Sequence, residues 1–160
     1  RALKVVPEVN SRFHDDALEI FESCNIGVAT ALEKEGLVVP VIRNAEKLDL
    51  FGIASALQDQ TARARDGKLI SADLQGGTFT ITNHGTSGSL IATPIISQPQ
   101  SAILGIGKLE RRPVVVERNG NETIEPRSRI YVTLTIDHRA LDGFVANLFL
   151  SEFVRSLESV

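Results

Sequence analysis

The stretch "RIYVTLTIDHRALDG", residues 129–143, decides how this sequence is interpreted. The run "YVTLTI" alternates apolar and polar residues, which is typical of a half-buried strand. The letters "DHR" follow at once, and "DG" then precedes a long segment with helical apolar spacing. The chain therefore passes from a strand to a helix through a short polar connection that contains His138. This histidine is either part of a solvated strand end or a reactive imidazole held by rigid elements.

The predicted C-terminal helix begins near residue 143 and continues toward residue 160. Six of its apolar residues share one broad face, as in a helix that packs on a sheet: Val145, Leu148, Phe149, Phe153, Val154 and Leu157. A second amphipathic helix is predicted over residues 50–65. Asp66-Gly67 is a plausible end for it.

Further runs rich in β-branched and apolar residues predict strands over residues 27–33, 37–44, 78–83, 101–107 and 113–117. The first two strands are expected to form a hairpin through the connection "KEG". The letters "RNGNE", residues 118–122, predict a turn that leads into the last strand, residues 129–136. Runs of strands with a few helices favour an α+β fold over alternating βαβ units.

Composition narrows the class of protein. A chain of 160 residues, 42% hydrophobic and 23% charged, suits one globular domain over residues 1–160. A net charge of -3 with scattered basic residues gives no reason to expect nucleic acid. The single cysteine, Cys24, excludes an internal disulfide framework, and no apolar run approaches the roughly 20 residues of a membrane helix. Because the chain begins without methionine, we expect a piece of a longer polypeptide.

His138 and Asp142 are the first candidates for chemistry. A histidine exchanges protons near neutral pH, which suits a general base. If both residues lay on one regular helix, they would share a face. If the helix instead begins at Asp142, the carboxylate braces the connection and caps the helix. The spacing alone leaves both arrangements open.

The segment "HRALDG" matches the H-x-x-x-D-G signature of coenzyme A-dependent acyltransferases built like chloramphenicol acetyltransferase. Three upstream stretches resemble the catalytic domain of the dihydrolipoamide acyltransferase component of 2-oxo acid dehydrogenase complexes. They are "ALKVVPEVNSRF", "GLVVPVIRNAEKLDLFGIA" and "GGTFTITNHGTSGSLIATPIISQPQSAILGIGKLERRPVVV". The resemblance implies a chloramphenicol acetyltransferase-like two-layer sandwich, a mixed sheet covered by helices. It also implies that the first helix and strand of the family domain are missing here.

The same resemblance implies an activity and three site residues. The family moves an acyl group between the thiols of dihydrolipoamide and coenzyme A. His138 would be the general base for the attacking thiol, and Asp142 would orient the connection that holds it. Thr82 of "FTITN" would donate a hydrogen bond to the oxyanion. Without the resemblance, Thr82 is a strand residue like its neighbours.

The resemblance also implies an assembly. Two subunits of a homotrimer would build each site, and trimers would form a cubic core of twenty-four subunits or an icosahedral core of sixty. Coenzyme A would be a substrate, and the lipoyl group would sit on a lipoyl domain outside this segment. Expected partners are the 2-oxo acid decarboxylase or dehydrogenase and the dihydrolipoamide dehydrogenase, with no nucleic acid and no membrane. The compartment would be the cytoplasm in bacteria or the mitochondrial matrix in eukaryotes.

Alternatives remain at the level of function. The first alternative function is a non-catalytic core component of the same complexes. The second is a free-standing coenzyme A-dependent acetyltransferase. The sequence does not distinguish between an acetyl, a succinyl and a branched-chain acyl group as the group transferred.

Other polar residues are weaker site candidates. Cys24 is expected to be structural, His84 a turn residue, and "HDD" at 14–16 a solvated loop or helix start without metal. The letters "GTSGS" lack the lysine of a phosphate-binding loop.

Overall fold

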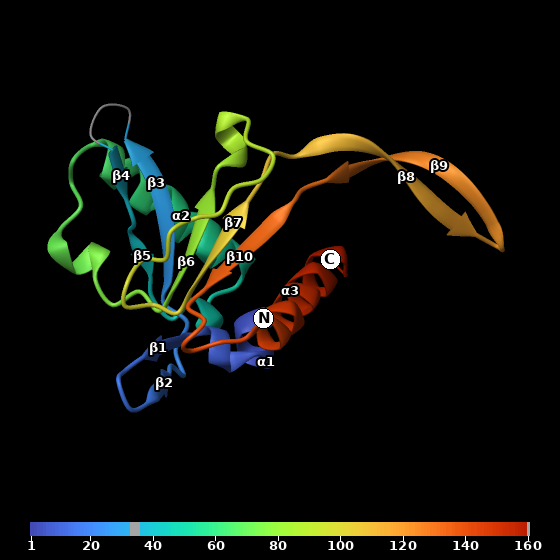
Figure 1. Cartoon of the computed structure of the whole chain (residues 1–160). Coiled ribbons are helices and arrows are strands. Elements are labelled where there is room, and N and C mark those ends of the chain that lie inside the picture. The colour runs from blue at the N-terminus through green and yellow to red at the C-terminus, as the bar shows by residue number, and fades with distance from the viewer. Residues whose placement is uncertain (33–35, 160) are drawn as a thin grey trace.

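The computed structural model describes residues 1–32 and 36–159. Its centre is a mixed sheet with the strand order β10-β7-β6-β3-β4, and β5 also pairs with β3 (Figure 1). The strands are β3 (Ile26–Leu32), β4 (Gly36–Val38), β5 (Val41–Ile42), β6 (Phe79–Asn83), β7 (Ala102–Ile106) and β10 (Val132–Ile136). The neighbours β3, β6 and β7 run parallel, whereas β4, β5 and β10 are antiparallel to their partners.

The two faces of this sheet differ in chemistry because side chains alternate along each strand. Apolar residues from β6, β7 and β10 pack into the core on one face, which we call the helix face: Phe79, Ile81, Ala102, Leu104, Val132, Leu134 and Ile136. The residues between them point to the opposite face, which we call the threonine face: Thr80, Thr82, Ile103, Gly105, Thr133 and Thr135. The alternation seen in the sequence is thus a division between core and a second, more polar surface.

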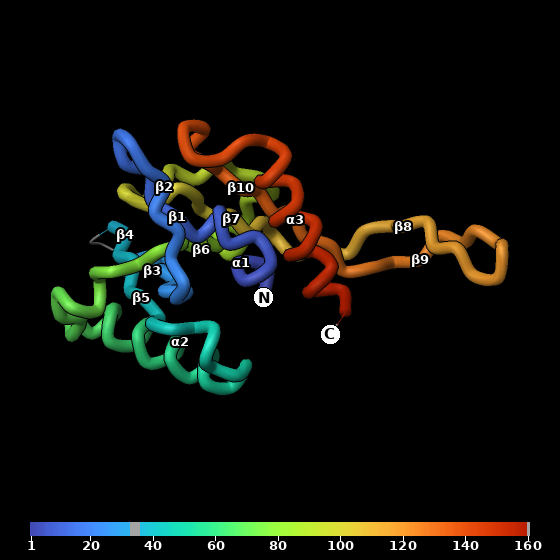
Figure 2. The backbone as a smooth tube through the Cα atoms, turned by 90° about the horizontal axis from the view of Figure 1, so that it is seen from below, coloured from blue at the N-terminus to red at the C-terminus, as the bar shows by residue number. Residues whose placement is uncertain are grey.

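Three helices cover the helix face: α1 (Ala2–Val5), α2 (Leu50–Arg65) and α3 (Gly143–Glu158) (Figure 2). Phe149 of α3 is 2% exposed, and its ring centroid lies 5.6 Å from that of Phe79 on β6. Burying two aromatic rings against each other is a large part of what attaches the helix to the sheet. The predicted helix over residues 50–65 is confirmed to the residue, as is its end at Asp66-Gly67.

Two hairpins lie outside the main sheet, and of their four strands only the one predicted over residues 113–117 was expected. β1 (Ser11–Phe13) pairs with β2 (Leu18–Ile20), so the segment read as a solvated loop or helix start contains a hairpin turn. β8 (Glu110–Arg118) pairs with β9 (Asn121–Arg129) and extends away from the body (Figure 1). The turn predicted at "RNGNE" is confirmed at Asn119-Gly120, but it leads into β9 and not into the strand predicted over residues 129–136. A polar strand intervenes, and its sequence shows no alternation because almost all of its residues are exposed.

Smaller differences concern lengths and faces. The strand predicted over 37–44 is interrupted between β4 and β5, and Lys34 and Glu35 of the predicted hairpin connection lie outside the described residues. Within residues 1–32 and 36–159 there are also four short 3-10 helices: η1 (Pro7–Val9), η2 (Ala45–Lys47), η3 (Ser71–Leu74) and η4 (Gly85–Ser87). On α3, Leu148 and Leu157 are 46% and 53% exposed, so the predicted apolar face is broader than the one the sheet covers.

Candidate active site

The connection between β10 and α3 is held rigidly on both sides of His138. The Asp137 backbone N–H donates to the carbonyl of Ser101, 2.8 Å away. Its carboxylate accepts from the Arg139 guanidinium at 3.0 and 2.7 Å and from the Arg139 backbone N–H at 3.0 Å. These hydrogen bonds, the guanidinium first, lower the pKa of Asp137. The Arg139 guanidinium also lies 4.8 Å from the centroid of the Phe13 ring. His138 is exposed between these two anchored residues.

Asp142 caps the following helix. Its Oδ1 accepts from the backbone N–H of Val145 at 2.9 Å, and α3 begins at Gly143. Of the two arrangements that the sequence left open, the structure has the cap, because His138 lies in the turn before the helix and not on it. Removing such a cap typically costs about 1 kcal/mol. Asp142 therefore fixes where the helix starts and hence where the histidine turn ends.

Thr82 lies on the threonine face, near the carboxyl end of β6. It is half-buried, and its strand partners are Ala29 on β3 and Gly105 on β7. The next residue, Asn83, ends the strand, and its side-chain Oδ1 accepts from the backbone N–H groups of Gly85 and Thr86. Thr82 thus lies near the end of a central strand, and its backbone is paired with a neighbouring strand on each side.

The structure separates Thr82 from His138 within one chain. In the strand register, Thr82 pairs with Gly105, and Gly105 pairs with Thr133. Ile136 lies three residues further along β10, and His138 lies beyond it. Three residues of strand and two strand spacings put the Cα atoms of Thr82 and Ile136 about 14 Å apart. The turn after β6 and the turn after β10 accordingly occupy opposite ends of the sheet (Figure 1).

The remaining sequence candidates lie elsewhere. Cys24 is buried, and burial first, then the charge of Glu46, raises the pKa of its thiol, which disfavours the nucleophilic thiolate. His14 lies in the turn of the first hairpin and contacts Glu19 at 3.1 Å. An apolar cavity of about 210 Å³ between the helices and the sheet is lined by residues of the helix face and contains neither Thr82 nor His138.

Sequence reasoning missed one feature of the site, the pairing of Asp137 with Arg139. The letters "DHR" predicted either a solvated strand end or a mount for a reactive imidazole, and neither prediction gave Asp137 and Arg139 a role of their own. The available signal was an acid and a base two residues apart around a histidine, in a turn where their side chains can meet.

The fold, Thr82 near the end of β6 and the turn that carries His138 define a class of protein. It is an α+β domain with helices on one face of a mixed sheet and a histidine in the turn before its last helix. The family model for 2-oxoacid dehydrogenases acyltransferase (catalytic domain) matches residues 1–160. The chain belongs to this family.

Two relatives show how broad the likeness is. The dihydrolipoyllysine-residue acetyltransferase component of the pyruvate dehydrogenase complex of Mycobacterium tuberculosis is 46% identical over 160 residues, 98% of this chain and 29% of that protein. The dihydrolipoyllysine-residue succinyltransferase component of the 2-oxoglutarate dehydrogenase complex of Rickettsia bellii is 45% identical over 158 residues, 99% of this chain and 38% of that protein. The chain thus spans about a third of the length of these relatives.

Solved structures share the fold. A probable dihydrolipoamide acetyltransferase from Listeria monocytogenes superposes with a TM-score of 0.92 at 38% identity, covering 99% of this chain and 65% of that one. The Azotobacter vinelandii dihydrolipoamide acetyltransferase, in a study of a serine, a histidine and an asparagine in its catalytic mechanism, gives 0.86 at 35%, covering 94% and 61%. The cubic core of a pyruvate dehydrogenase multienzyme complex gives 0.85 at 34%, covering 93% and 60%. The predicted fold class is confirmed.

None of the helices within residues 1–32 and 36–159 combines the length and the apolar character needed to cross a membrane.

Proposed function

We propose that this chain is the catalytic domain of a dihydrolipoamide acyltransferase, which moves an acyl group between dihydrolipoamide and coenzyme A. The observation that carries the proposal is the anchored histidine turn, in which Asp137, Arg139 and Asp142 fix the backbone around an exposed His138. Family membership over residues 1–160 supports it. The proposed acyl group is acetyl, succinyl or branched-chain. Relatives of similar identity are named for acetyl and succinyl transfer, which supports the first two.

The proposed reaction needs a base and an oxyanion donor. His138 takes the proton of the incoming thiol, and the sulfur attacks the carbonyl carbon of the thioester. The carbonyl oxygen becomes an oxyanion that accepts from the Thr82 hydroxyl, which typically contributes about 3 kcal/mol. The intermediate then collapses, the carbon–sulfur bond to the departing thiol breaks, and His138 returns the proton to that sulfur. No acyl group is attached to the protein at any step.

The residue types agree with those studied in a relative. The work on the Azotobacter vinelandii acetyltransferase concerned a serine, a histidine and an asparagine. Thr82, His138 and Asp142 offer the corresponding chemistry here: a hydroxyl donor, an imidazole and a short side chain that can cap a helix. Asp142 is proposed to orient the histidine turn through its bond to Val145, without transferring a proton.

The proposed site lies between subunits. Because Thr82 and His138 sit at opposite ends of one sheet, a second chain must supply the partner of each, and a homotrimer with heterologous contacts does so. The ribbon of β8 and β9 extends away from the body (Figure 1) and carries the paired residues Val115 and Ile124, which are 61% and 74% exposed. An exposed apolar pair on a protruding ribbon is typical of a surface that another chain covers.

The proposed assembly extends beyond the trimer. The cubic core among the structural neighbours supports association of trimers into a cubic or icosahedral core. The proposed partners are a lipoyl domain, a 2-oxo acid decarboxylase or dehydrogenase and a dihydrolipoamide dehydrogenase, because the relatives are components of such complexes. We place the protein in the cytoplasm of a bacterium or in the mitochondrial matrix of a eukaryote.

The proposal is tested by measuring transfer from acetyl-, succinyl- and isobutyryl-coenzyme A to dihydrolipoamide, followed by the release of free coenzyme A. His138→Ala is expected to lower kcat by about 100-fold or more with the oligomer intact. His14→Ala is the matched control, because His14 is exposed in the first hairpin, and it should transfer at the wild-type rate. Wild-type turnover by His138→Ala would refute the assignment, and no transfer from any donor would favour a scaffold component.

A further inference from the structure

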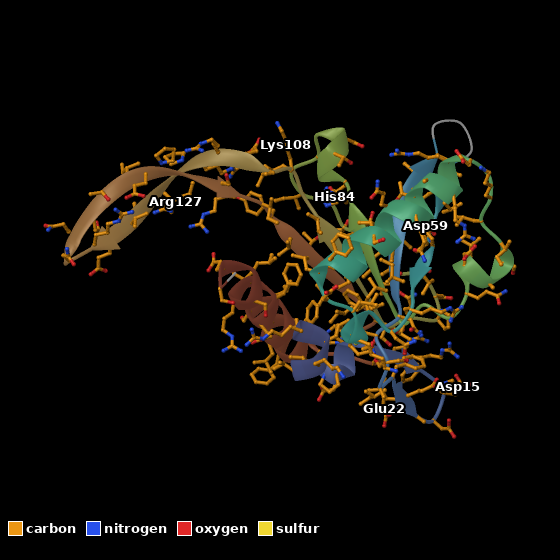
Figure 3. The ribbon with its side chains drawn as sticks, turned by 180° about the vertical axis from the view of Figure 1, so that it is seen from behind. Asp15, Glu22, Asp59, His84, Lys108 and Arg127 are labelled. Carbon is orange, nitrogen blue, oxygen red and sulfur yellow. The ribbon has the colours of Figure 1, made fainter. Side chains whose placement is uncertain are left out.

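His84 is held firmly at the carboxyl end of β6, two residues after Thr82. Its backbone N–H donates to the carbonyl of Ile106 at 3.1 Å, and its carbonyl accepts from Ser87 and Ser89. Figure 3 shows His84 at the end of the sheet near Lys108, away from α1 and α3. The backbone of this residue is therefore fully engaged, and only the imidazole is left to make further bonds.

The turn that carries His84 packs directly on the end of β7. A Cβ at Gly85 would lie 2.3 Å from the carbonyl carbon and oxygen of Gly107, and a Cβ at Gly107 would lie 2.1 Å from the carbonyl oxygen of Leu90. Both positions therefore need glycine to let the backbones meet. This contact holds Gly85, the residue after His84, against the end of β7, so that the His84 ring lies on the threonine face of the sheet.

The ring fills the space left by a glycine beside Thr82. A Cβ at Gly105 would lie 3.3 Å from His84 Nε2, 3.3 Å from Pro94 Cδ and 2.6 Å from Thr133 Oγ1. Gly105 is the strand partner of both Thr82 and Thr133, so its Cα is about one strand spacing, close to 4.8 Å, from each. The imidazole therefore lies over the glycine that separates these two threonines.

Within the described residues, the imidazole of His84 has no hydrogen-bond partner. Both ring nitrogens of His84 are buried, and neither makes a hydrogen bond within the part of the chain that the structure describes. Burying a polar atom without a hydrogen bond is unfavourable, and such atoms are rare in folded proteins. A buried donor that lacks a partner at rest points to a partner that becomes available in another state.

Of the two hydroxyls beside it, the one on Thr82 fits this role better. The Thr133 hydroxyl already donates to the carbonyl of Ala92 at 2.7 Å, which anchors the loop that crosses this face. Thr82 is the proposed oxyanion donor, and while its hydrogen points to the oxyanion its oxygen lone pairs remain free to accept.

We propose that His84 is a positioning residue for the oxyanion donor, an inference that rests on the proposed function of Thr82. The N–H at Nε2 donates to the Thr82 hydroxyl oxygen while the Thr82 O–H donates to the oxyanion. The bond fixes the direction of the hydroxyl hydrogen, and the two bonds polarise each other, which strengthens the second. His84 itself touches neither substrate nor the reacting atoms.

The test compares substitutions at residue 84 in the native full-length oligomer, with oligomer mass and melting temperature checked for each. His84→Leu is expected to lower kcat by about 5- to 10-fold, the change that one hydrogen bond makes, with KM within about 2-fold. His84→Gln retains an N–H donor near Nε2 and should keep about half of the activity or more. If His84→Leu does not assemble, His84→Met serves the same comparison.

Double variants identify which threonine is involved. In a Thr82→Ala background, His84→Leu should change kcat by less than about 2-fold, because the bond it removes is already lost. In a Thr133→Val background, His84→Leu should keep its full effect. An equal loss in His84→Gln and His84→Leu, or an undiminished loss in the Thr82→Ala background, would overturn the inference alone. Wild-type kcat in Thr82→Ala would overturn both the oxyanion-donor assignment and the inference built on it.

Discussion

The separation of the two half-sites predicts that two inactive variants restore each other. A His138→Ala subunit keeps an intact Thr82, and a Thr82→Ala subunit keeps an intact His138. Within one chain the two residues lie at opposite ends of the sheet, since Thr82 is level with Thr133 and His138 follows the end of β10. Activity in a mixture can therefore come only from sites that join two different subunits.

The size of the effect follows from counting interfaces in the proposed trimer. A complete site needs an intact His138 from one subunit and an intact Thr82 from its neighbour. The subunit that supplies His138 must therefore be Thr82→Ala, and the neighbour that supplies Thr82 must be His138→Ala. With equal and random mixing, each condition holds for half of the subunits, so about a quarter of the sites are complete. The unselected mixture should recover about 25% of wild-type kcat per subunit, and trimers selected to contain both variants about a third, because one of their three interfaces is complete. Each parent retains about 1% or less.

The assay uses co-expression of the two variants with different affinity tags, so that tandem purification isolates mixed oligomers. Acyl transfer is measured on the mixed oligomers, on each parent and on the wild type, and native mass spectrometry gives the subunit ratio. A mixture of separately assembled parents is the control and should stay inactive. Mixed oligomers of confirmed composition that are as inactive as their parents would refute the shared site.

Two further predictions concern stability and its dependence on pH. Phe149→Ala should lower the free energy of unfolding by about 3–5 kcal/mol in urea titrations, because Phe149 is 2% exposed and packs on Phe79. Phe144→Ala, on the same helix but 71% exposed, should change it by about 0.5 kcal/mol or less, and equal losses would contradict the packing argument. Arg139 lowers the pKa of Asp137 below its ordinary 3.8, so this pair stabilises the folded state above that pH and ceases to do so as pH falls through the lowered value. Asp137→Asn should therefore reduce the melting temperature near pH 7 but progressively less below about pH 4, and a constant difference over this range would count against the pair.

The local patterns of the sequence predicted the elements that carry the core. The helix over residues 50–65 has the predicted bounds. The strands predicted over 78–83 and 101–107 lie in the main sheet, as do the described residues of the strand predicted over 27–33, of which Glu33 lies outside the described residues. These predictions succeeded because the periods of 3.6 and 2 follow directly from burying one side of a helix or strand. The hairpin strand β9 was missed because almost all of its residues are exposed, so its sequence carries no period of 2.

The candidate site divides in the same way. His138, Asp142 and Thr82 were named from motifs, and their roles stay predictions that the variants above can test. The structure settled the local role of Asp142 as a helix cap, because the choice depended on where α3 begins. The pairing of Asp137 with Arg139 needed the conformation of the turn, which residue types alone do not specify.

The sequence by itself predicted most of the helices and strands of the core, the family that the chain resembles, and the residues that are candidates for acyl transfer. It did not predict α1, which contributes Ala2 to the core. Only the tertiary structure decided where those candidate residues stand. The order β10-β7-β6-β3-β4 and the register of Thr82, Gly105 and Thr133 put Thr82 and His138 at opposite ends and lay His84 over a glycine gap. Strand order and register depend on contacts between residues far apart in the chain, and a local pattern of apolar and polar residues does not encode them.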